Sequence, residues 1–415
     1  MASANPVILG YDAISPLGTD LDAQFDRAVR GESGIGPLTR FPLTDDFPVR
    51  IAGEVPEIDP TPYPFLSPRS LALWPSPIFR HALLTVHRAL AMAGVEITPD
   101  LAPRTAVTFS SAVGGQDALV AADRKLAAGA GLPPPYANPN ACINMVGGRV
   151  STLTGATGPI IATITACATG LTSVLAGAML IAAGRADVAL CGAVDFPLVA
   201  PIVAGFATMN AAFRSKPGDE TPPSEASRPF SVNRRGFVIS EGAAAIILAS
   251  NDFAKAHGLS RKIELAGWAM TSDAHHFVAP HLPTVQRCIE ESLADAGIAP
   301  EAVDAVNAHA TATKAGDRVE ADALRSVFGG KIPPVTANKG QIGHAMGAAS
   351  AIETVLAIRG METGQLPPTI NYTPDPAIEI DCAPETARPL AQTYLLKNAF
   401  GFGGCNACAV FKRTE

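Results

Sequence analysis

The sequence predicts an α/β fold in which parallel strands alternate with helices. Strand-like apolar runs are followed by helix-like runs rich in Ala and Leu, which is the pattern of βαβ units. The 415 residues are 47% hydrophobic and only 17% charged, with a mean hydropathy of +0.22, so the chain can bury a large core. Aromatic residues make up only 6%, whereas 37 glycines and 36 prolines supply many turns.

The first half of the chain contains several strand candidates and one clear helix. Residues 106–109 are apolar and short, and residues 169–183 form a longer run of Ala and Leu that indicates a helix. Further strands are expected at 188–191 and 243–248. The polar, proline-rich stretch between Phe213 and Gly236 is typical of a surface excursion.

A second half begins near residue 255 and repeats the first half in outline. In each half a strand candidate is later followed by a small-residue turn that opens a helix, at 105–109 and 168–183 and again at 305–308 and 347–359. The letters of the two halves match poorly, so the similarity is one of architecture. We therefore expect two similar halves, residues 1–254 and 255–415.

Charge and composition argue against several classes of function. The 31 basic and 38 acidic residues give a net charge of −7, which does not suit a nucleic-acid partner. The N-terminus lacks a basic stretch followed by an apolar segment, and no apolar run is long enough to span a membrane. We expect a cytoplasmic protein, in which seven irregularly spaced cysteines are reduced thiols.

Cys167 is a candidate nucleophile. It follows a predicted buried strand, residues 160–166, at the point where Ala168-Thr169-Gly170 opens the helix. Unpaired N–H groups and the dipole at a helix N-terminus favour the thiolate. A free cysteine is as often a small buried hydrophobe, so the local sequence leaves both interpretations open.

Two histidines and a glycine-rich turn are further candidates. His309 follows the strand at 306–308 and is expected at the carboxyl edge of the sheet, where α/β proteins bind ligands. His344 lies in a glycine-bounded loop five residues after Lys339. For either histidine taken alone, a satisfied interior donor is the more common case. The turn at 398–406 could present backbone N–H groups as an oxyanion hole or be only a tight hairpin.

Metal and phosphate sites have less support. Cys405 and Cys408 form a Cys-x-x-Cys pair, but no second pair follows and a strand would point the two side chains to opposite faces. A zinc site of Cys167, His309 and His344 lacks any short paired spacing of ligands. The glycine-rich stretches also lack a Walker lysine pattern.

Taken together, these segments resemble the elongating β-ketoacyl-acyl-carrier-protein synthases of the thiolase superfamily over nearly the whole chain. The matching segments are, in chain order, 7–10, 15–18, 31–35, 144–145, 165–167, 226–230, 236–238, 272–276, 307–309, 316–317, 339, 343–344 and 400–404. The resemblance implies a five-layered αβαβα fold with two pseudo-symmetric halves. It also implies a homodimer or a heterodimer with a ketosynthase-like partner, no bound metal or cofactor, and substrates carried on the phosphopantetheine of an acyl carrier protein.

The resemblance implies a role for each matching residue. Cys167 would take an acyl chain as a thioester. His309 and His344 would bind the malonyl thioester carbonyl and stabilise the enolate that forms as carbon dioxide leaves, and the enolate would then extend the chain by two carbons. Lys339 and Glu353 would form a charged pair that orients His344. The other positions that the resemblance assigns are Glu320 in the same network, Thr311 and Thr313 at the pantetheine arm, Phe206 and Val113 in the acyl pocket, the backbone N–H groups of Cys167 and Phe402 at an oxyanion, and Phe400 and Phe402 at the gate.

The chain departs from the usual family pattern at several positions. Cys405 replaces a Thr, and Ala310 replaces a Gly. Around residues 69–74 few basic residues remain for docking an acidic carrier protein, which leaves Arg69, Arg214 and Lys216 as candidates. Ala137 stands near a position where the family often has a bulky aromatic at the dimer interface, so a wider acyl tunnel is a hypothesis.

Two other functions are conceivable within the same superfamily. A chain-length-factor-like subunit would shape the tunnel of a ketosynthase heterodimer with little activity of its own. Such partners usually lose the cysteine, so the presence of Cys167 beside both histidines favours an active enzyme. A thiolase would need a second catalytic cysteine near the C-terminus, for which Cys405 and Cys408 are the candidates.

Overall fold

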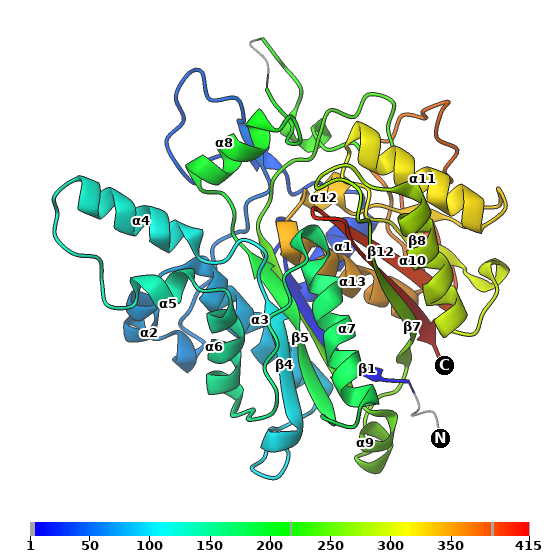
Figure 1. Ribbon diagram of the computed structural model, residues 1–415, viewed down its shortest axis with the longest axis horizontal. Coiled ribbons are helices and arrows are strands. Elements are labelled where there is room, and N and C mark those ends of the chain that lie inside the picture. The colour runs from blue at the N-terminus through cyan, green and yellow to red at the C-terminus, as the bar shows by residue number, and fades with distance from the viewer. Residues whose placement is uncertain (1–4, 216–217, 383–385, 415) are drawn as a thin grey trace.

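The computed structural model describes residues 5–215, 218–382 and 386–414 (Figure 1), so Lys216 lies outside the described residues. A nine-stranded sheet runs through the molecule in the order β4-β5-β6-β1-β7-β13-β12-β8-β9. In that order the strands are β4 (Thr105–Ser110), β5 (Val188–Asp195), β6 (Gly242–Ala249), β1 (Val7–Ile14), β7 (Ile263–Ser272), β13 (Cys405–Arg413), β12 (Tyr394–Gly401), β8 (Ala305–Asn307) and β9 (Val335–Thr336).

The sheet consists of two halves with the same pairing pattern. In the N-terminal half β4 and β5 are parallel, whereas β5–β6 and β6–β1 are antiparallel. In the C-terminal half β8 and β12 are parallel, whereas β12–β13 and β13–β7 are antiparallel. A short pairing of β1 with β7 joins the halves at Val7 and Ile8. The predicted pseudo-symmetry is therefore confirmed at the level of topology.

Helices form three further layers around the sheet halves. Helices α3 (Pro77–Ala93) and α6 (Asn144–Thr154) pack on the outer face of the N-terminal half, and α10 (Leu282–Asp295) packs on the outer face of the C-terminal half beside α11 (Lys314–Val327). Helices α7 (Thr169–Ala182) and α13 (Met346–Thr363) lie between the halves and contact both (Figure 1). The order of layers is α, β, α, β, α, as the resemblance implied.

The remaining helices and short strands lie in the connections. They are α1 (Leu21–Val29), α2 (Pro68–Leu73), α4 (Gln116–Ala127), α5 (Ala137–Ala141), α8 (Ala200–Thr208), α9 (Asn251–Ala256), α12 (Lys339–Ile342), β2 (Gly36–Pro37), β3 (Ile51–Ala52), β10 (Gln365–Leu366) and β11 (Arg388–Pro389). Among the described residues, none of these or the longer helices combines the length and apolarity that a bilayer crossing needs.

The expected parallel pairing holds only for β4–β5, β12–β8 and β8–β9, whereas every pair of the large sheet that includes β1, β6, β7 or β13 is antiparallel. Most of the predicted elements themselves are confirmed. The strands expected at 106–109, 188–191 and 243–248 lie within β4, β5 and β6, and the helix expected at 169–183 is α7. All seven cysteines are free thiols. On β13, Cys405 is partly exposed whereas Cys408 is buried, as strand alternation predicted.

The strand predicted at 160–166 is wrong for the single chain. One isolated bridge pairs Ile160 with Val107, and the rest of the segment joins no ladder within the described part of the chain. The side chains of Ile160, Ile161 and Ile164 are 46%, 39% and 53% exposed. The apolar run suggested burial, but its large side chains face outward.

The loop from β8 to α11 has a strained backbone. Ala310 and Ala312 have φ values of 24° and 63°, in a region that glycine adopts freely and residues with a Cβ rarely do. Ala312 is fully buried, so the surrounding packing holds this conformation in place. The departure from the usual Gly at position 310 thus falls where a Cβ is strained.

We expect Ala312→Gly to cost little stability. Relief of about 1–2 kcal/mol of strain should offset the lost methyl burial and the greater freedom of the unfolded chain, so the free energy of unfolding should change by less than about 0.5 kcal/mol. The exposed Ala121 in the middle of α4 is the control, where the same change should cost about 1 kcal/mol. Denaturant unfolding measures both, and equal losses at the two positions would contradict the strain argument.

Candidate active site

Cys167 lies in a 3₁₀ turn, Ala166–Ala168, that runs directly into α7. Ala166 has a φ of 48°, so the turn just before the cysteine is strained. The turn also packs closely on the end of β12, where a Cβ on Gly401 would collide with the carbonyl of Thr165. Gly401 therefore lets the glycine-rich hairpin approach the thiol.

Burial raises the pKa of the Cys167 thiol to about 11, although Lys339 and the backbone N–H groups of Phe402 and Cys167 act to lower it. The helix N-terminus was expected to favour the thiolate. The backbone N–H groups of Cys167 and Phe402 do act in that direction, but loss of hydration outweighs them. In the resting site Cys167 is a neutral thiol at physiological pH, and its reactivity requires a base.

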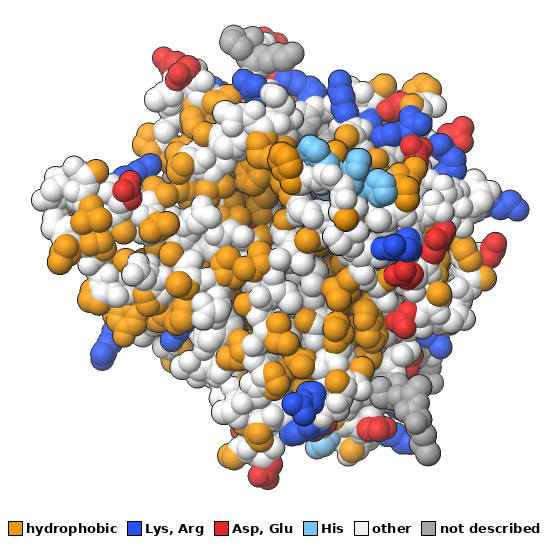
Figure 2. Space-filling model, in the orientation of Figure 1, with side chains coloured by type: hydrophobic (Ala, Val, Ile, Leu, Met, Phe, Trp, Pro, Cys, Tyr) orange, Lys and Arg blue, Asp and Glu red, His pale blue; other side chains and the backbone are white. Residues whose placement is uncertain are grey.

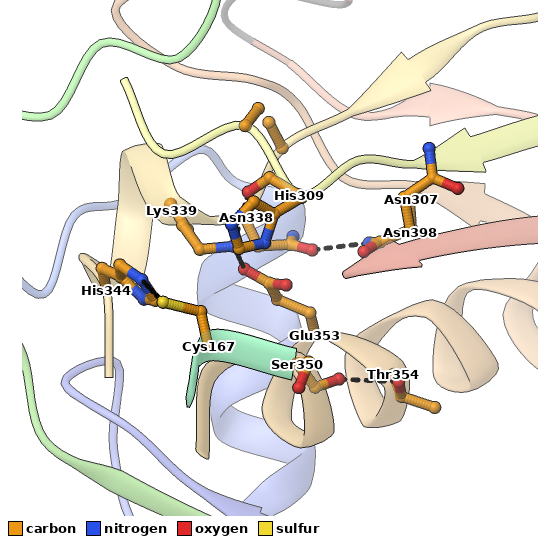
Figure 3. A network of polar contacts seen from close by, with 12 residues as sticks. Cys167, Asn307, His309, Asn338, Lys339, His344, Ser350, Glu353, Thr354 and Asn398 are labelled. Carbon is orange, nitrogen blue, oxygen red and sulfur yellow. Dashed lines mark hydrogen bonds and ion pairs between the residues drawn. The ribbon is translucent and has the colours of Figure 1, made fainter. Parts of the chain in front are cut away.

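His344 lies within reach of the thiol. Its Nε2 atom is 3.1 Å from the Sγ atom of Cys167, and the two side chains point toward one another (Figure 3). The loop between α12 and α13 holds this histidine, whose backbone N–H donates to the carbonyl of Val238 at 2.7 Å. Burial and then the charge of Lys339 lower the pKa of His344 well below its usual value, so the imidazole is neutral.

His309 lies just beyond β8 and faces the same space, as predicted from the carboxyl edge of the sheet. Its ring centroid is 5.9 Å from that of His344 and 5.7 Å from that of Phe400. Burial, and after it the charge of Lys339, hold the pKa of His309 well below its usual value. The Nδ1 atoms of both histidines are buried without a hydrogen-bond partner among the described residues. Two neutral imidazoles therefore flank one buried thiol.

A buried charged network lies behind the histidines (Figure 3). Lys339 Nζ is 2.5 Å from Glu353 Oε1 and donates to the backbone carbonyl of His309 at 2.5 Å. The carboxylate of Glu320 accepts the backbone N–H groups of His309 at 2.8 Å and of Ala310 at 2.7 Å. Lys339 and Glu353 form the expected ion pair. Among the described residues, Lys339 donates to the backbone carbonyl of His309, and no hydrogen bond joins the pair to His344.

A cavity of about 1170 Å³ joins the other predicted residues. Ten of the twelve line it: Cys167, His309, His344, Phe400, Phe402, Thr311, Thr313, Phe206, Val113 and Glu320. The hydroxyls of Thr311 and Thr313 lie 3.0 Å apart on its wall. Lys339 and Glu353 lie behind the wall and act on the cavity through the histidines.

The candidates for docking and for the tunnel have different positions. Arg214 lines the outer part of the cavity together with Arg235 and Lys314. The cavity lining does not include Arg69 or Ala137, so in the described chain neither residue touches this space.

The sequence analysis did not identify two buried charged residues, Asp195 and Lys397. Asp195 accepts the Ser111 hydroxyl and the backbone N–H groups of Val113 and Gly347, so it ties the cavity wall to the start of α13. Lys397 is fully buried on β12 and lies 2.9 Å from Glu353 Oε2. The available signal was the same for both, a single charge in an otherwise apolar strand.

Comparison with protein families decides the relationship of the chain. The model described as "Beta-ketoacyl synthase, N-terminal domain" matches residues 5–254, and "Beta-ketoacyl synthase, C-terminal domain" matches residues 263–373. The chain belongs to the β-ketoacyl synthase family. Members of this family are acyltransferases, and the resemblance found in the sequence is confirmed.

Similar proteins extend over the full length of this β-ketoacyl synthase. The 3-oxoacyl-(acyl-carrier-protein) synthase 2 of Coxiella burnetii is 35% identical over 421 residues, which cover 100% of this chain and 99% of the relative. The protein of the same name from Staphylococcus aureus is 33% identical over 416 residues, which cover 99% of this chain and 98% of the relative.

Solved structures also resemble the chain over nearly its full length. A type II PKS acyl-carrier protein in complex with its ketosynthase bound to the hexaketide includes a chain with a TM-score of 0.90 and 26% identity, covering 99% of this chain and 100% of that one. The ishigamide ketosynthase/chain length factor has a TM-score of 0.89 and 30% identity, with 100% of both chains covered. The thiolase-like α/β fold is therefore shown.

The zinc alternative has no support in this β-ketoacyl synthase. Among the described residues, no group of three or more His, Cys, Asp or Glu side chains is arranged to hold a metal ion. The two side chains of the Cys-x-x-Cys pair also lie apart. The Sγ atom of Cys408 donates to Asn398 Oδ1 inside the core at 3.3 Å. Cys405 lies on the other face of β13, just after the glycine-rich turn.

The raised pKa of Cys167 predicts a pH-dependent alkylation rate. In a Cys142→Ser background, which removes the exposed thiol, labelling of Cys167 by a small neutral reagent should rise about tenfold per pH unit from about pH 7 to pH 9. Only the thiolate reacts, and its fraction grows with pH until the pKa is reached. Peptide mass spectrometry follows the rate. A rate that levels off below pH 8 would show that the thiol is already ionised in the resting site.

Proposed function

We propose that this chain is a 3-oxoacyl-(acyl-carrier-protein) synthase that performs a decarboxylative Claisen condensation. The observation that carries the proposal is a buried thiol, Cys167, 3.1 Å from one neutral histidine and sharing a cavity with a second. Loss of a carboxylate leaves an enolate, and two neutral N–H donors in a largely apolar cavity stabilise that charge. The family and the relatives described above support the same reaction.

In the first step the acyl group moves from the carrier protein to Cys167. His344 Nε2 accepts the thiol proton as the sulfur attacks the thioester carbonyl, and the proton then passes to the departing pantetheine thiolate. The backbone N–H groups of Cys167 and Phe402, which hydrogen bond at the sulfur, are suited to hold the oxyanion of this step. Phe402 and Phe400 stand at the cavity wall, where movement of their hairpin gates entry.

In the second step a malonyl group enters on a carrier protein. Thr311 and Thr313 bind the pantetheine arm. His309 and His344 donate to the thioester carbonyl, His344 now as the tautomer that is protonated at Nε2. The carbon–carbon bond to the carboxylate breaks, carbon dioxide leaves, and the enolate attacks the Cys167 thioester. A carbon–carbon bond forms, the carbon–sulfur bond breaks, and the Cys167 thiolate takes up one proton from solvent, which restores the thiol. Val113 and Phe206 line the acyl side of the cavity.

We further propose that the chain functions as two halves, residues 1–254 and 255–415, in the cytoplasm. Each half contributes to the site, because Cys167 comes from the first and both histidines from the second. The seven free thiols suit a reducing compartment. Arg214, Arg235 and Lys314 at the outer part of the cavity suit an acidic carrier protein.

We propose that the segment 160–164 forms a dimer interface. Hydrophobic side chains with few charges cover the middle of the face drawn in Figure 2. Ile160, Ile161 and Ile164 are large exposed side chains on a segment that pairs with β4 at a single bridge. A second chain, identical or ketosynthase-like, would extend the sheet and bury these residues.

Ile161→Asp should weaken this association, because a charge placed in an apolar interface must lose its hydration. Light scattering on a dilution series should show a larger fraction of single chains than in the parent. Met92→Asp is the matched control, since Met92 is 49% exposed on the outer helix α3. Equal association of both variants with the parent would contradict the proposed interface.

The alternative function, a chain-length-factor-like subunit with little activity, has one supporting observation in the likeness to the ketosynthase/chain length factor described above. The test is intact-protein mass spectrometry after incubation with acyl-carrier proteins of several chain lengths and then malonyl-carrier protein. We expect an acyl adduct that is absent from Cys167→Ala and is lost as a product two carbons longer forms. The absence of an adduct at every chain length would favour the silent subunit.

A further inference from the structure

Lys397 is a fully buried lysine that the proposed mechanism does not use. It lies on β12, three residues before Phe400 of the gate. Its Nζ atom is 2.9 Å from Glu353 Oε2 and donates to the backbone carbonyl of Asn398 at 2.8 Å. Glu353 thus binds two ammonium groups, one on each oxygen, since Oε1 contacts Lys339 at 2.5 Å.

The charges of this cluster balance only when Lys397 is counted. Lys339 and Glu353 alone form a neutral pair, and Glu320 adds a second carboxylate that is almost completely buried. Asn398 connects the new cation to this carboxylate, because its backbone carbonyl accepts from Lys397 and its Nδ2 donates to Glu320 Oε1 at 3.1 Å. With Lys397 the cluster has two positive and two negative groups. Without it, one carboxylate is left buried and uncompensated.

The cluster holds the peptide groups on both sides of His309. Glu320 accepts the backbone N–H groups of His309 and Ala310 on its two oxygens. Lys339 donates to the carbonyl of His309 from the other side. A protonated Glu320 would lose one of its two acceptor oxygens to an O–H group, and the strained loop at Ala310 would lose a hydrogen bond.

We propose that Lys397 is a positioning residue whose charge balances the buried carboxylates of Glu320 and Glu353 and thereby fixes His309 for decarboxylation of the malonyl group. The assignment of Lys397 to the decarboxylation step rests on the proposed function. The role of the charge rests only on the contacts of Lys397, Glu353, Asn398 and Glu320.

Other titratable groups face the cluster from each element packed around it. They are Lys339 of α12, Glu353 of α13, Glu320 and Asp317 of α11, His309 and His344 of the two loops, Cys408 of β13 and Cys288 of α10. Burial raises the pKa of Glu320, and Lys397 acts to lower it. Lys397 also acts with Lys339 to lower the pKa of His309.

Removal of the Lys397 charge should therefore shift the pKa of Glu320 and the pKa of His309 in the same direction. The pKa of Glu320 rises, so its carboxylate is lost at a higher pH, and the pKa of His309 rises, so its neutral form is lost at a higher pH. Both changes therefore reduce the fraction of protein with ionised Glu320 and neutral His309 as the pH falls. The acid limb of decarboxylation should move upward by about 1–3 pH units.

The experiment compares Lys397→Met with Lys412→Met, a control on the same hairpin whose side chain is partly exposed and stacks on Tyr394. Decarboxylation of malonyl-carrier protein is measured from about pH 5 to pH 9, and acylation of Cys167 is measured in parallel. We expect Lys397→Met alone to shift the acid limb, with acylation retained at pH 8. A limb that coincides with that of Lys412→Met would overturn the proposal.

A second readout does not depend on activity. Infrared difference titration of the resting protein detects the protonated carboxyl band, which should appear at a higher pH in Lys397→Met than in the parent and should lose intensity when Glu320→Gln is added. An unchanged titration would overturn the role of Lys397, whereas a shifted titration without any decarboxylation in the parent would overturn only the proposed function.

If Lys397→Met does not fold, the double variant Lys397→Met/Glu320→Gln decides the question, because it removes one charge of each sign. We expect the double variant to regain a cooperative unfolding transition. A double variant that is as unfolded as the single one would show that Lys397 does not act through charge balance.

Discussion

The close approach of α7 and α13 in the buried middle layer is the constraint on which the site depends. A Cβ on Gly170 would collide with the backbone of Ala351, and the backbone N–H of Leu171 donates to the Ser350 hydroxyl at 3.0 Å. Small residues therefore let the first turns of the two helices meet. Because Cys167 precedes one helix and His344 precedes the other, this contact brings together two residues that are 177 positions apart. His309 reaches the same site because β8, the strand before it, ends at the carboxyl edge of the sheet.

Burial then decides the chemistry of these side chains. It raises the pKa of Cys167 and lowers those of His309 and His344, so all three rest in their neutral forms. The same burial makes the ion pairs behind the histidines expensive, since charges removed from water regain that energy only through good partners. The stability of the core does not require these buried ion pairs. Their presence next to the site is better explained by the backbone of His309, which they hold from both sides.

The sequence was sufficient for elements and for residue types, and insufficient for contacts across the fold. The runs at 106–109 and 188–191 became strands because their apolar residues enter the core. The run at 160–166 is similarly apolar but lies at the surface, and nothing local distinguishes the two cases. The net pKa shift at Cys167 could not be predicted for a related reason, because helix position is visible in a sequence and desolvation is not. The partners of Lys339 and Lys397 come from distant segments, so no spacing could have revealed them.

Backbone strain surrounds the three central side chains of the site. Non-glycine residues with positive φ stand next to each of the three central side chains: Ala166 before Cys167, Ala310 and Ala312 after His309, and Met346 after His344. Each costs stability in the folded chain relative to a relaxed backbone. Alanine also restricts the loop more than glycine would, so fewer alternative conformations compete with the observed one. A site that must align a thiol and two imidazoles within a few ångströms gains from that restriction, and the buried bonds of Glu320 and Lys339 are what hold the strained segment after His309 in place.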